Sequence, residues 1–205
     1  MHRPAPLRRR RLQRDADFTG ERIEQFSEVW LRHGLPGALL GAVCLLHPGS
    51  RDLLVRSTSN LLADPLPYVL AGLLLLTVML LWRFIGDRRL DRISAIWVLY
   101  LLGVSVWEEW VFRLAVPYAA LAYGADLGVA VVLSNAAFGL AHYFTLRWKW
   151  YWCVGAALGG MGLSRLLEAE MDLAVIVGIH WLGTFLNTPA PPAGSVMRRA
   201  GQSAV

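Results

Sequence analysis

The chain has 205 residues, of which 56% are hydrophobic and 17% charged, and its formal net charge is +5. The charges are concentrated in a few places and the apolar residues form long runs, whereas a soluble domain of this size mixes the two finely. These features exclude an ordinary soluble domain, and two cysteines in separate apolar segments exclude a disulfide framework. The chain is predicted to be a helical membrane protein.

Six apolar segments are candidates to cross a bilayer, whose hydrocarbon core is about 30 Å thick. The run from Pro67 to Phe84 has no charge before Arg83 and no polar face, which is typical of a transmembrane helix rather than a soluble one. In chain order the segments are 29–47, 67–85, 93–123, 127–145, 149–164 and 172–188.

The third segment, 93–123, is too long for one straight crossing. It predicts either one tilted helix or two short helices broken near Trp107 to Trp110, with Pro117 as a further bend. The basic residues favour one crossing, because positive charge prefers the cytoplasmic side of a membrane. If segment 93–123 crosses once, all four clusters of basic residues fall on the same side of the membrane. These clusters lie in the N-terminal tail, at 83–92, at 147–149 and at 198–199.

We therefore predict an all-α, polytopic transmembrane helix bundle with about six crossings and both termini on the cytoplasmic side of the cell membrane. Residues 1–28 form a basic tail, 29–92 the N-terminal spans, 93–188 the helix bundle that carries the chemistry, and 189–205 a flexible tail. Arginines beside a membrane span mark its orientation and bind anionic lipid. Membrane lipid is therefore an expected partner, and nucleic acid is not.

Two adjacent glutamates lie inside the third segment. A charged side chain inside the bilayer is costly and needs a partner or a purpose. Glu109 and Arg113 are four residues apart, so on a helix they share a face and are expected to form an ion pair. Glu108 lies one position round the helix, about 100° away, and cannot easily use the same arginine. We therefore interpret Glu108 as a candidate general base and the Glu109–Arg113 pair as a brace for its helix.

Two histidines lie in later apolar segments. His142 shares a helical face with Phe138, and a histidine near a helix end is most often a hydrogen-bonded interfacial residue. His180 lies well inside the last segment, and Thr184 and Asn187 follow it at four and seven positions along the same face. This polar stripe is expected to face the bundle interior, where it either joins helices by hydrogen bonds or carries chemistry.

These motifs in this order, with Glu108-Glu109-xxx-Arg113 first, Phe138-xxx-His142 next and His180 in the last apolar helix, resemble the CPBP intramembrane proteases. This is the CAAX-prenyl-protease-like and bacteriocin-processing family, also called the Abi family. The resemblance covers residues 93–188. It implies an intramembrane endopeptidase that hydrolyses a peptide bond of a membrane-associated substrate. Its catalytic residues would lie on three helices that face a cavity within the membrane.

The resemblance also implies a role for each residue. Glu108 and His142 correspond to the glutamate and histidine that position and deprotonate a water molecule. His180 corresponds to the histidine that stabilises the oxyanion of the tetrahedral intermediate. The chain departs from the family at Thr184, where an asparagine is common. Thr184 is therefore the expected fourth catalytic residue, unless Asn187, one turn further along, takes its place.

Two alternatives stay open. Glu108, His142 and His180 can together hold a zinc ion, whose bound water would be the nucleophile. No HExxH motif is present and the ligands come one per helix, so a mechanism without a cofactor is preferred. In the second alternative the chain is a membrane immunity or scaffold protein, and the polar cluster joins its helices. The expected partner of an enzyme is a peptide or protein with a membrane-associated cleavage site.

Overall fold

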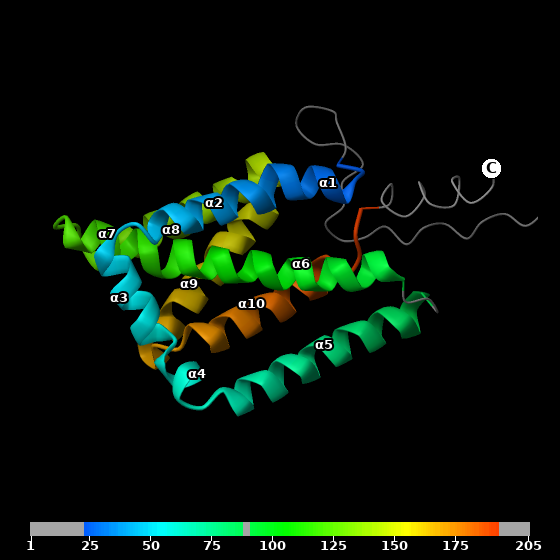
Figure 1. The fold of residues 1–205 in the computed structure, drawn as a ribbon. Helices are drawn as coiled ribbons and strands as arrows, with labels where there is room; N and C mark the ends of the chain where they lie inside the picture. The colour runs from blue at the N-terminus through cyan, green and yellow to red at the C-terminus, as the bar shows by residue number, and fades with distance from the viewer. Residues whose placement is uncertain (1–22, 88–90, 193–205) are drawn as a thin grey trace, which may run out of the picture.

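The computed structural model describes residues 23–87 and 91–192, and every regular element within these ranges is helical (Figure 1). The all-α fold predicted from the sequence is confirmed. Most of the expected tails, 1–28 and 189–205, lies outside the described residues. The elements are α1 (Phe26–Val29), η1 (Trp30–Gly34), α2 (Leu35–Cys44), α3 (Pro48–Ser57), α4 (Ser59–Ala63), α5 (Pro65–Asp87), α6 (Arg92–Glu109), η2 (Trp110–Ala115), α7 (Val116–Ala122), α8 (Leu127–Thr145), α9 (Trp150–Glu170) and α10 (Leu173–Asn187).

Three of the long helices begin at an aspartate that lies just before the first turn. Asp91 before α6, Asp126 before α8 and Asp172 before α10 accept hydrogen bonds from backbone N–H groups of the following turn, at 2.7, 2.9 and 3.1 Å. A side-chain oxygen in this position satisfies N–H groups that have no partner within the helix. The three aspartates therefore fix where these helices start.

The third predicted segment is one continuous helix from Arg92 to Ala122, 31 residues long, made of α6, η2 and α7. The structure thus has a single long helix here and not two short ones. Within it η2 is π-helical, and Pro117 lies in the first turn of α7. Proline has no N–H to offer the carbonyl group four residues before it. A π-helical turn shifts the backbone bonds by one residue and accommodates that loss.

Three helices are long and apolar enough to cross a membrane: Pro65–Gly86, Arg92–Ala122 and Leu127–Thr145. A fourth candidate is the pair Phe26–Cys44 and Pro48–Ser57, which is bent by 104° and is either a broken span or a re-entrant loop. α10 is apolar but only 15 residues long. The described residues therefore form a helical membrane bundle with three or four candidate spans, and the six crossings expected from the sequence are not confirmed.

The N-terminal part differs most from the sequence prediction. The helix expected over 29–47 ends at Cys44, and two short helices that hydropathy does not predict, α3 and α4, follow it before α5. Pro48 begins α3 and Pro65 begins α5, positions where proline is tolerated because the first N–H groups of a helix have no partner. α9 continues to Glu170, beyond the segment predicted at 149–164.

α6 lies in the middle of the bundle, with α2 on one side and α10 and α5 on the other (Figure 1). Three tryptophans fasten the neighbouring elements together, because each indole N–H donates to a backbone carbonyl group of another segment. The pairs are Trp97 with Thr188 (2.8 Å), Trp181 with Val98 (2.9 Å) and Trp110 with Gly41 (2.9 Å). Buried indoles that reach a partner in this way fix the position of one helix against the next.

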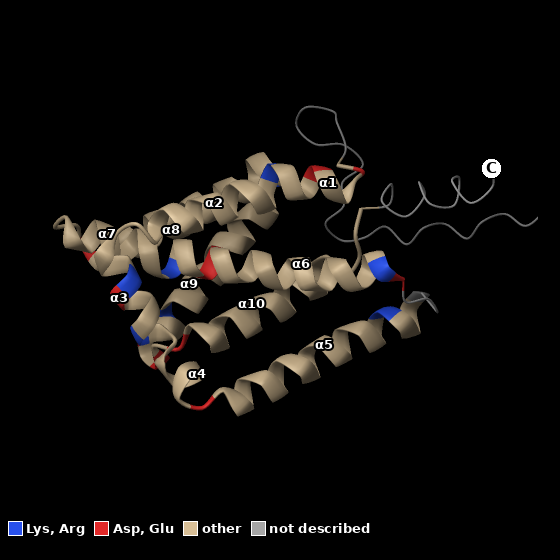
Figure 2. Cartoon of the chain, viewed as in Figure 1, with Lys and Arg blue, Asp and Glu red and all other residues tan. Residues whose placement is uncertain are grey.

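Charged residues of the described chain gather mainly at helix ends and in connections (Figure 2). The long helix formed by α6 and η2 is different, because acidic and basic residues also lie between its two ends (Figure 2). These charged residues, Glu108, Glu109 and Arg113, are at most 2% exposed. The centre of an otherwise apolar bundle is therefore polar, and this centre is where chemistry is expected.

α8 and α9 pack closely through a glycine. A side-chain carbon at Gly139 would lie 2.6 Å from the backbone carbonyl oxygen of Cys153, which is closer than such atoms approach. Small residues at helix contacts allow this close approach in membrane proteins. Gly155, also on α9, is exposed, and a side-chain carbon there would meet open space.

Gly139→Ala is therefore expected to lower the thermal unfolding temperature of the purified protein, because the added methyl group forces α8 and α9 apart at a cost of about 1–3 kcal/mol. Gly155→Ala is the matched control, since it adds the same group to an open helix face and improves helix propensity. Unfolding followed by intrinsic fluorescence in detergent measures both. Equal unfolding temperatures for the two variants would contradict the close α8–α9 contact.

Candidate active site

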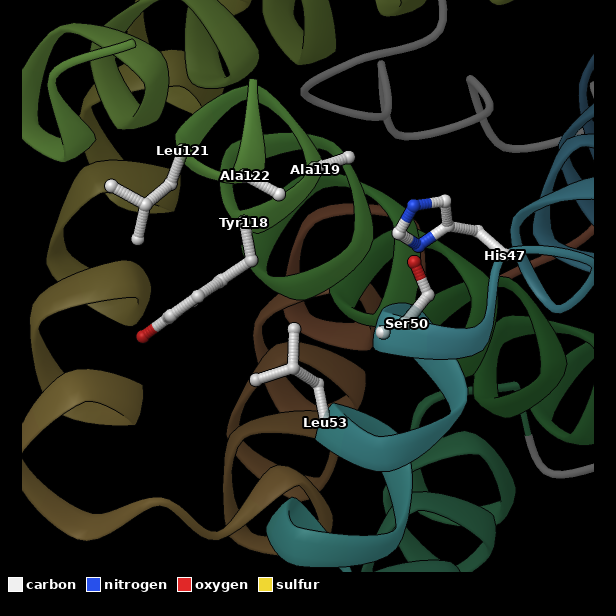
Figure 3. Close-up of a pocket in the computed structure, with 8 residues that line it drawn as sticks. His47, Ser50, Leu53, Tyr118, Ala119, Leu121 and Ala122 are labelled. Carbon is white, nitrogen blue, oxygen red and sulfur yellow. The ribbon is translucent and has the colours of Figure 1, made fainter. Parts of the chain in front are cut away.

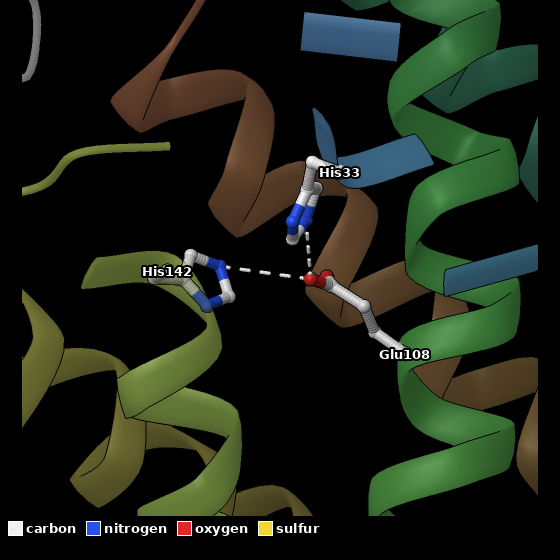
Figure 4. A group of neighbouring side chains, drawn as sticks. All are labelled: His33, Glu108 and His142. Atoms are coloured by element: carbon white, nitrogen blue, oxygen red, sulfur yellow. Dashed lines mark hydrogen bonds and ion pairs between the residues drawn. The ribbon is translucent and has the colours of Figure 1, made fainter. Parts of the chain in front are cut away.

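Three imidazole rings from three other elements surround the carboxylate of Glu108, which is 1% exposed. Its Oε1 lies 2.9 Å from Nε2 of His33 in η1 and 3.6 Å from Nε2 of His142 in α8, as Figure 4 shows. Its Oε2 lies 3.4 Å from Nε2 of His180 in α10. The structure thus brings together Glu108, His142 and His180, the three residues on which the sequence hypothesis rests.

The two predicted histidines turn Nε2 toward Glu108 because their other ring nitrogen is held elsewhere. Nδ1 of His142 donates to the backbone carbonyl of Phe138 at 2.9 Å. Nδ1 of His180 lies 2.5 Å from Oε1 of Glu109. Both partners accept hydrogen bonds, so Nδ1 carries the hydrogen in each ring and Nε2 is the nitrogen available for chemistry.

One member of the cluster, His33, is not expected from the motifs. In the sequence it stands out only as a polar interruption of the first apolar segment. The rule that an ionisable group at membrane depth needs a partner or a purpose also applies to it, and that rule is the signal that identifies it. Glu108 cannot easily use Arg113 but has a partner from another element, because Nε2 of His33 is at hydrogen-bond distance from its carboxylate.

The ion pair predicted between Glu109 and Arg113 is present, with 3.2 Å between Oε1 and Nη2 and both side chains fully buried. The guanidinium group also lies over the ring of Phe138, 4.2 Å from its centroid. A side-chain carbon at Gly160 of α9 would come within 2.7 Å of the same guanidinium group. Arg113 therefore fills the space where α6, α8 and α9 meet, and the pair braces the helix that carries Glu108.

Aromatic rings close the site on one side. The ring of Phe138 is 4.5 Å from that of His142 and 5.9 Å from that of His180, measured between centroids. Trp148 lies 4.5 Å from His142 in the same measure. These rings separate the cluster from its surroundings and strengthen the electrostatic interactions within it. Phe138, which the motif pairs with His142, therefore contacts the rings of both His142 and His180.

The fourth predicted position is less well defined. Thr184 lies one helical turn after His180 on α10 and is half-buried, and its backbone carbonyl accepts hydrogen bonds from the backbone and hydroxyl of Thr188. Asn187 is the last residue of α10 and is exposed. Within the described part of the chain, no hydrogen bond of the Thr184 hydroxyl or the Asn187 amide is present. Their roles stay predictions.

The cluster also has the composition of a metal site. His33, Glu108 and His142 each offer one ligand atom, and these three atoms lie within 4.8 Å of one another. This set contains His33 in place of His180, which the sequence predicted as the third zinc ligand. Two histidines and a carboxylate are a ligand set that catalytic zinc uses. An ion would have to replace the direct 2.9 Å contact between His33 and Glu108.

A separate cavity of about 210 Å³ lies between α3 and α7 (Figure 3). None of the residues around Glu108 lines it, so it is not part of the glutamate–histidine cluster. Its lining is mostly apolar and consists of His47, Gly49, Ser50, Leu53, Tyr118, Ala119, Leu121 and Ala122.

Fold and site together define a class, a helical membrane protein with a buried glutamate–histidine centre. Residues 91–186 match the family model described as Rce1-like, type II CAAX prenyl endopeptidase. Comparisons with curated proteins and with solved structures gave no match. The resemblance to the CAAX-type (CPBP) intramembrane proteases that was inferred from the sequence is thus confirmed for residues 91–186, which make up less than half of the chain. The matched region contains Glu108, His142 and His180 but not His33.

Replacing Arg113 with methionine is expected to destabilise the protein by about 3–5 kcal/mol, because the buried carboxylate of Glu109 loses its cation. Chemical unfolding of the purified protein in detergent measures the loss. Arg165→Met on the exposed face of α9 is the control and should change stability little. The double variant Glu109→Gln/Arg113→Met should be more stable than Arg113→Met alone. The brace is refuted if Arg113→Met and Arg165→Met are equally stable.

Proposed function

We propose that the chain hydrolyses a peptide bond of a membrane-associated substrate with a water molecule activated by Glu108 and His142. The observation that carries this proposal is the arrangement of one buried carboxylate beside an imidazole whose ring is oriented by a second hydrogen bond. Oε1 of Glu108 and Nε2 of His142 are 3.6 Å apart, which is long for a hydrogen bond. We place the water molecule beside these two atoms, about 2.8 Å from each, where it can donate a hydrogen bond to both.

The reaction follows general acid–base chemistry. His142 accepts a hydrogen bond from the water through the Nε2 lone pair, because its Nδ1 hydrogen is engaged with Phe138. Glu108 takes a proton as the water oxygen bonds to the carbonyl carbon, and it returns that proton to the amine nitrogen as the C–N bond breaks. The products are a carboxylic acid and an amine, and the enzyme ends each cycle in its starting state without a cofactor.

His180 and Thr184 are proposed to stabilise the oxyanion. Glu109 accepts a hydrogen bond from Nδ1 of His180 and so favours the imidazolium form, as the carboxylate of a catalytic triad does. The Nε2 hydrogen of that form then points toward the Glu108 carboxylate and can donate to the developing negative charge. The hydroxyl of Thr184, one turn further along α10, adds a shorter donor than the asparagine amide common in the family.

The substrate we propose is a peptide or protein whose cleavage site is presented at the bilayer. A buried site in a membrane bundle is reached by segments that themselves associate with lipid. α5 is consistent with contact between the bundle and lipid, because its apolar stretch is only 11% buried and several of its leucines are exposed on the outside of the bundle. The positive-inside rule further leads us to place both termini in the cytoplasm. The family description names a type II CAAX prenyl endopeptidase, and of that activity we propose for this chain only the cleavage of a peptide bond within the membrane.

Glu108→Ala is expected to lower the rate of cleavage about 100-fold or more, because the general base is lost, while the protein still folds. Mass spectrometry of membrane peptides, with and without the chain, identifies the substrate and then measures its cleavage. Glu109→Ala should reduce stability as well as rate, since it leaves Arg113 unpaired. Glu168→Ala, exposed on α9, is the control. Full cleavage by Glu108→Ala would refute the mechanism, and unchanged membrane peptides would favour a scaffold or immunity protein.

A zinc-dependent protease is the second candidate, and the grouping of His33, Glu108 and His142 favours it. We expect the purified protein to contain less than stoichiometric zinc and to keep its activity in chelator. The physical reason is that His33 and Glu108 already use their facing atoms on each other. Elemental analysis and cleavage assays before and after chelation decide the point. Stoichiometric zinc that is lost together with activity, and restores activity when added back, would establish the metal mechanism.

A further inference from the structure

His33 stands outside the region that matches the CAAX-type protease family, yet it makes the shortest contact of the three histidines with Glu108. We propose that His33 is a positioning residue of the active site, which holds the catalytic carboxylate through Nε2 and makes the N-terminal helix part of the catalytic unit. The inference rests on the proposed function, because it assigns His33 a part in the reaction of Glu108.

Hydrogen bonds hold both nitrogens of the His33 ring. Nδ1 lies 2.7 Å from the hydroxyl oxygen of Thr145, which is itself 2.6 Å from the carbonyl of Ala141. Nε2 lies 2.9 Å from Oε1 of Glu108. Because an ionised carboxylate oxygen only accepts, Nε2 donates the hydrogen of this bond. This is a charge-assisted hydrogen bond.

That bond offsets the cost of burying Glu108. Glu108 and Glu109 are both fully buried, and Arg113 is engaged by Glu109. His142 and His180 approach Glu108 at 3.6 and 3.4 Å, which exceeds normal hydrogen-bond length. Among the described residues, the direct hydrogen bond to this carboxylate comes from His33.

Arg32, the neighbour of His33, fixes the end of the helix that carries His142. Its Nε donates to the carbonyl of Thr145 and its Nη2 to the carbonyl of Phe144, each at 3.1 Å. The last carbonyl groups of a helix have no partner within it, and a cation is favoured there. η1 therefore binds the C-terminal end of α8 through Arg32 and reaches Glu108 on α6 through His33.

Two glycines let the N-terminal helix lie close enough for this contact. A side-chain carbon at Gly34 would lie 2.8 Å from the ring of Tyr100, and one at Gly37 would collide with the indole of Trp107. Both aromatic residues belong to α6. The helix that carries His33 is thus seated directly on the helix that carries Glu108, which gives the His33 ring a defined position.

The test uses the full-length protein in lipid nanodiscs and the substrate identified by mass spectrometry. His33→Leu should lower kcat about 10–100-fold with little change in KM, because a displaced catalytic group slows the chemical step. His33→Gln keeps an N–H donor near the position of Nε2 and should recover most of the rate. Thr145→Val should lower kcat less than His33→Leu. It should add nothing to His33→Leu, since both act through one ring.

His47→Leu is the matched control, because His47 is the other described histidine of the N-terminal part and lies outside the cluster. It should leave kcat and KM unchanged. His33→Leu with the kcat of the wild type overturns the inference, and so does a His33→Gln variant as slow as His33→Leu. If these results come with an inactive Glu108→Ala, the proposed function stands. An active Glu108→Ala overturns the proposed function itself.

The hydrogen bond can also be measured without activity. In protein with ¹⁵N-labelled histidines, the five imidazoles are assigned by single substitutions. Glu108→Gln should shift the ¹⁵N resonances of His33, because Nε2 loses the charged carboxylate to which it donates. The resonances of His47 should not move. Unchanged resonances of His33 in Glu108→Gln would overturn the inference even if His33→Leu fails to fold.

Discussion

The bundle is organised around a carboxylate that it must bury. A charge such as that of Glu108 is costly at membrane depth unless hydrogen bonds and opposite charge compensate it. Arg113 forms its ion pair with Glu109, so the groups that stabilise the buried carboxylate of Glu108 have to come from other helices. These groups are His33, His142 and His180, from η1, α8 and α10. Three elements therefore converge on one side chain of α6.

The same compensation prepares the site for chemistry. His33 holds one oxygen of the Glu108 carboxylate by a direct hydrogen bond, and His142 and His180 lie at longer distances from the carboxylate. In the mechanism that we propose, this arrangement lets the carboxylate bind a water molecule without a large rearrangement, as electrostatic preorganisation requires. The order is imposed from outside the cluster, by Phe138 on His142, Glu109 on His180 and Thr145 on His33. Each of these partners lies on a packed helix and not on a loop, so the orientations of the imidazole rings are fixed by the packing of the helices.

Local sequence patterns predicted the features that depend on residues close together in the chain. Hydropathy and charge gave the helical class and the long helix 93–123, and the four-residue spacing gave the pair of Glu109 with Arg113. His33 was not predicted as a site residue, because its contact with Glu108 joins residues 75 positions apart in the chain and follows no periodic pattern. The short helices α3 and α4 were not predicted for a different reason, since α3 is polar on average and gives no apolar signal.

The match to the protease family begins at residue 91, but the physical site does not. The carboxylate at its centre is hydrogen-bonded by η1, and the end of the His142 helix is held by Arg32 of the same element. A bundle cut at the matched boundary would leave Glu108 without its direct hydrogen bond and the last carbonyl groups of α8 without a cation. The electrostatic interactions around Glu108 thus include the N-terminal helix, and the catalytic unit that we propose extends back at least to η1.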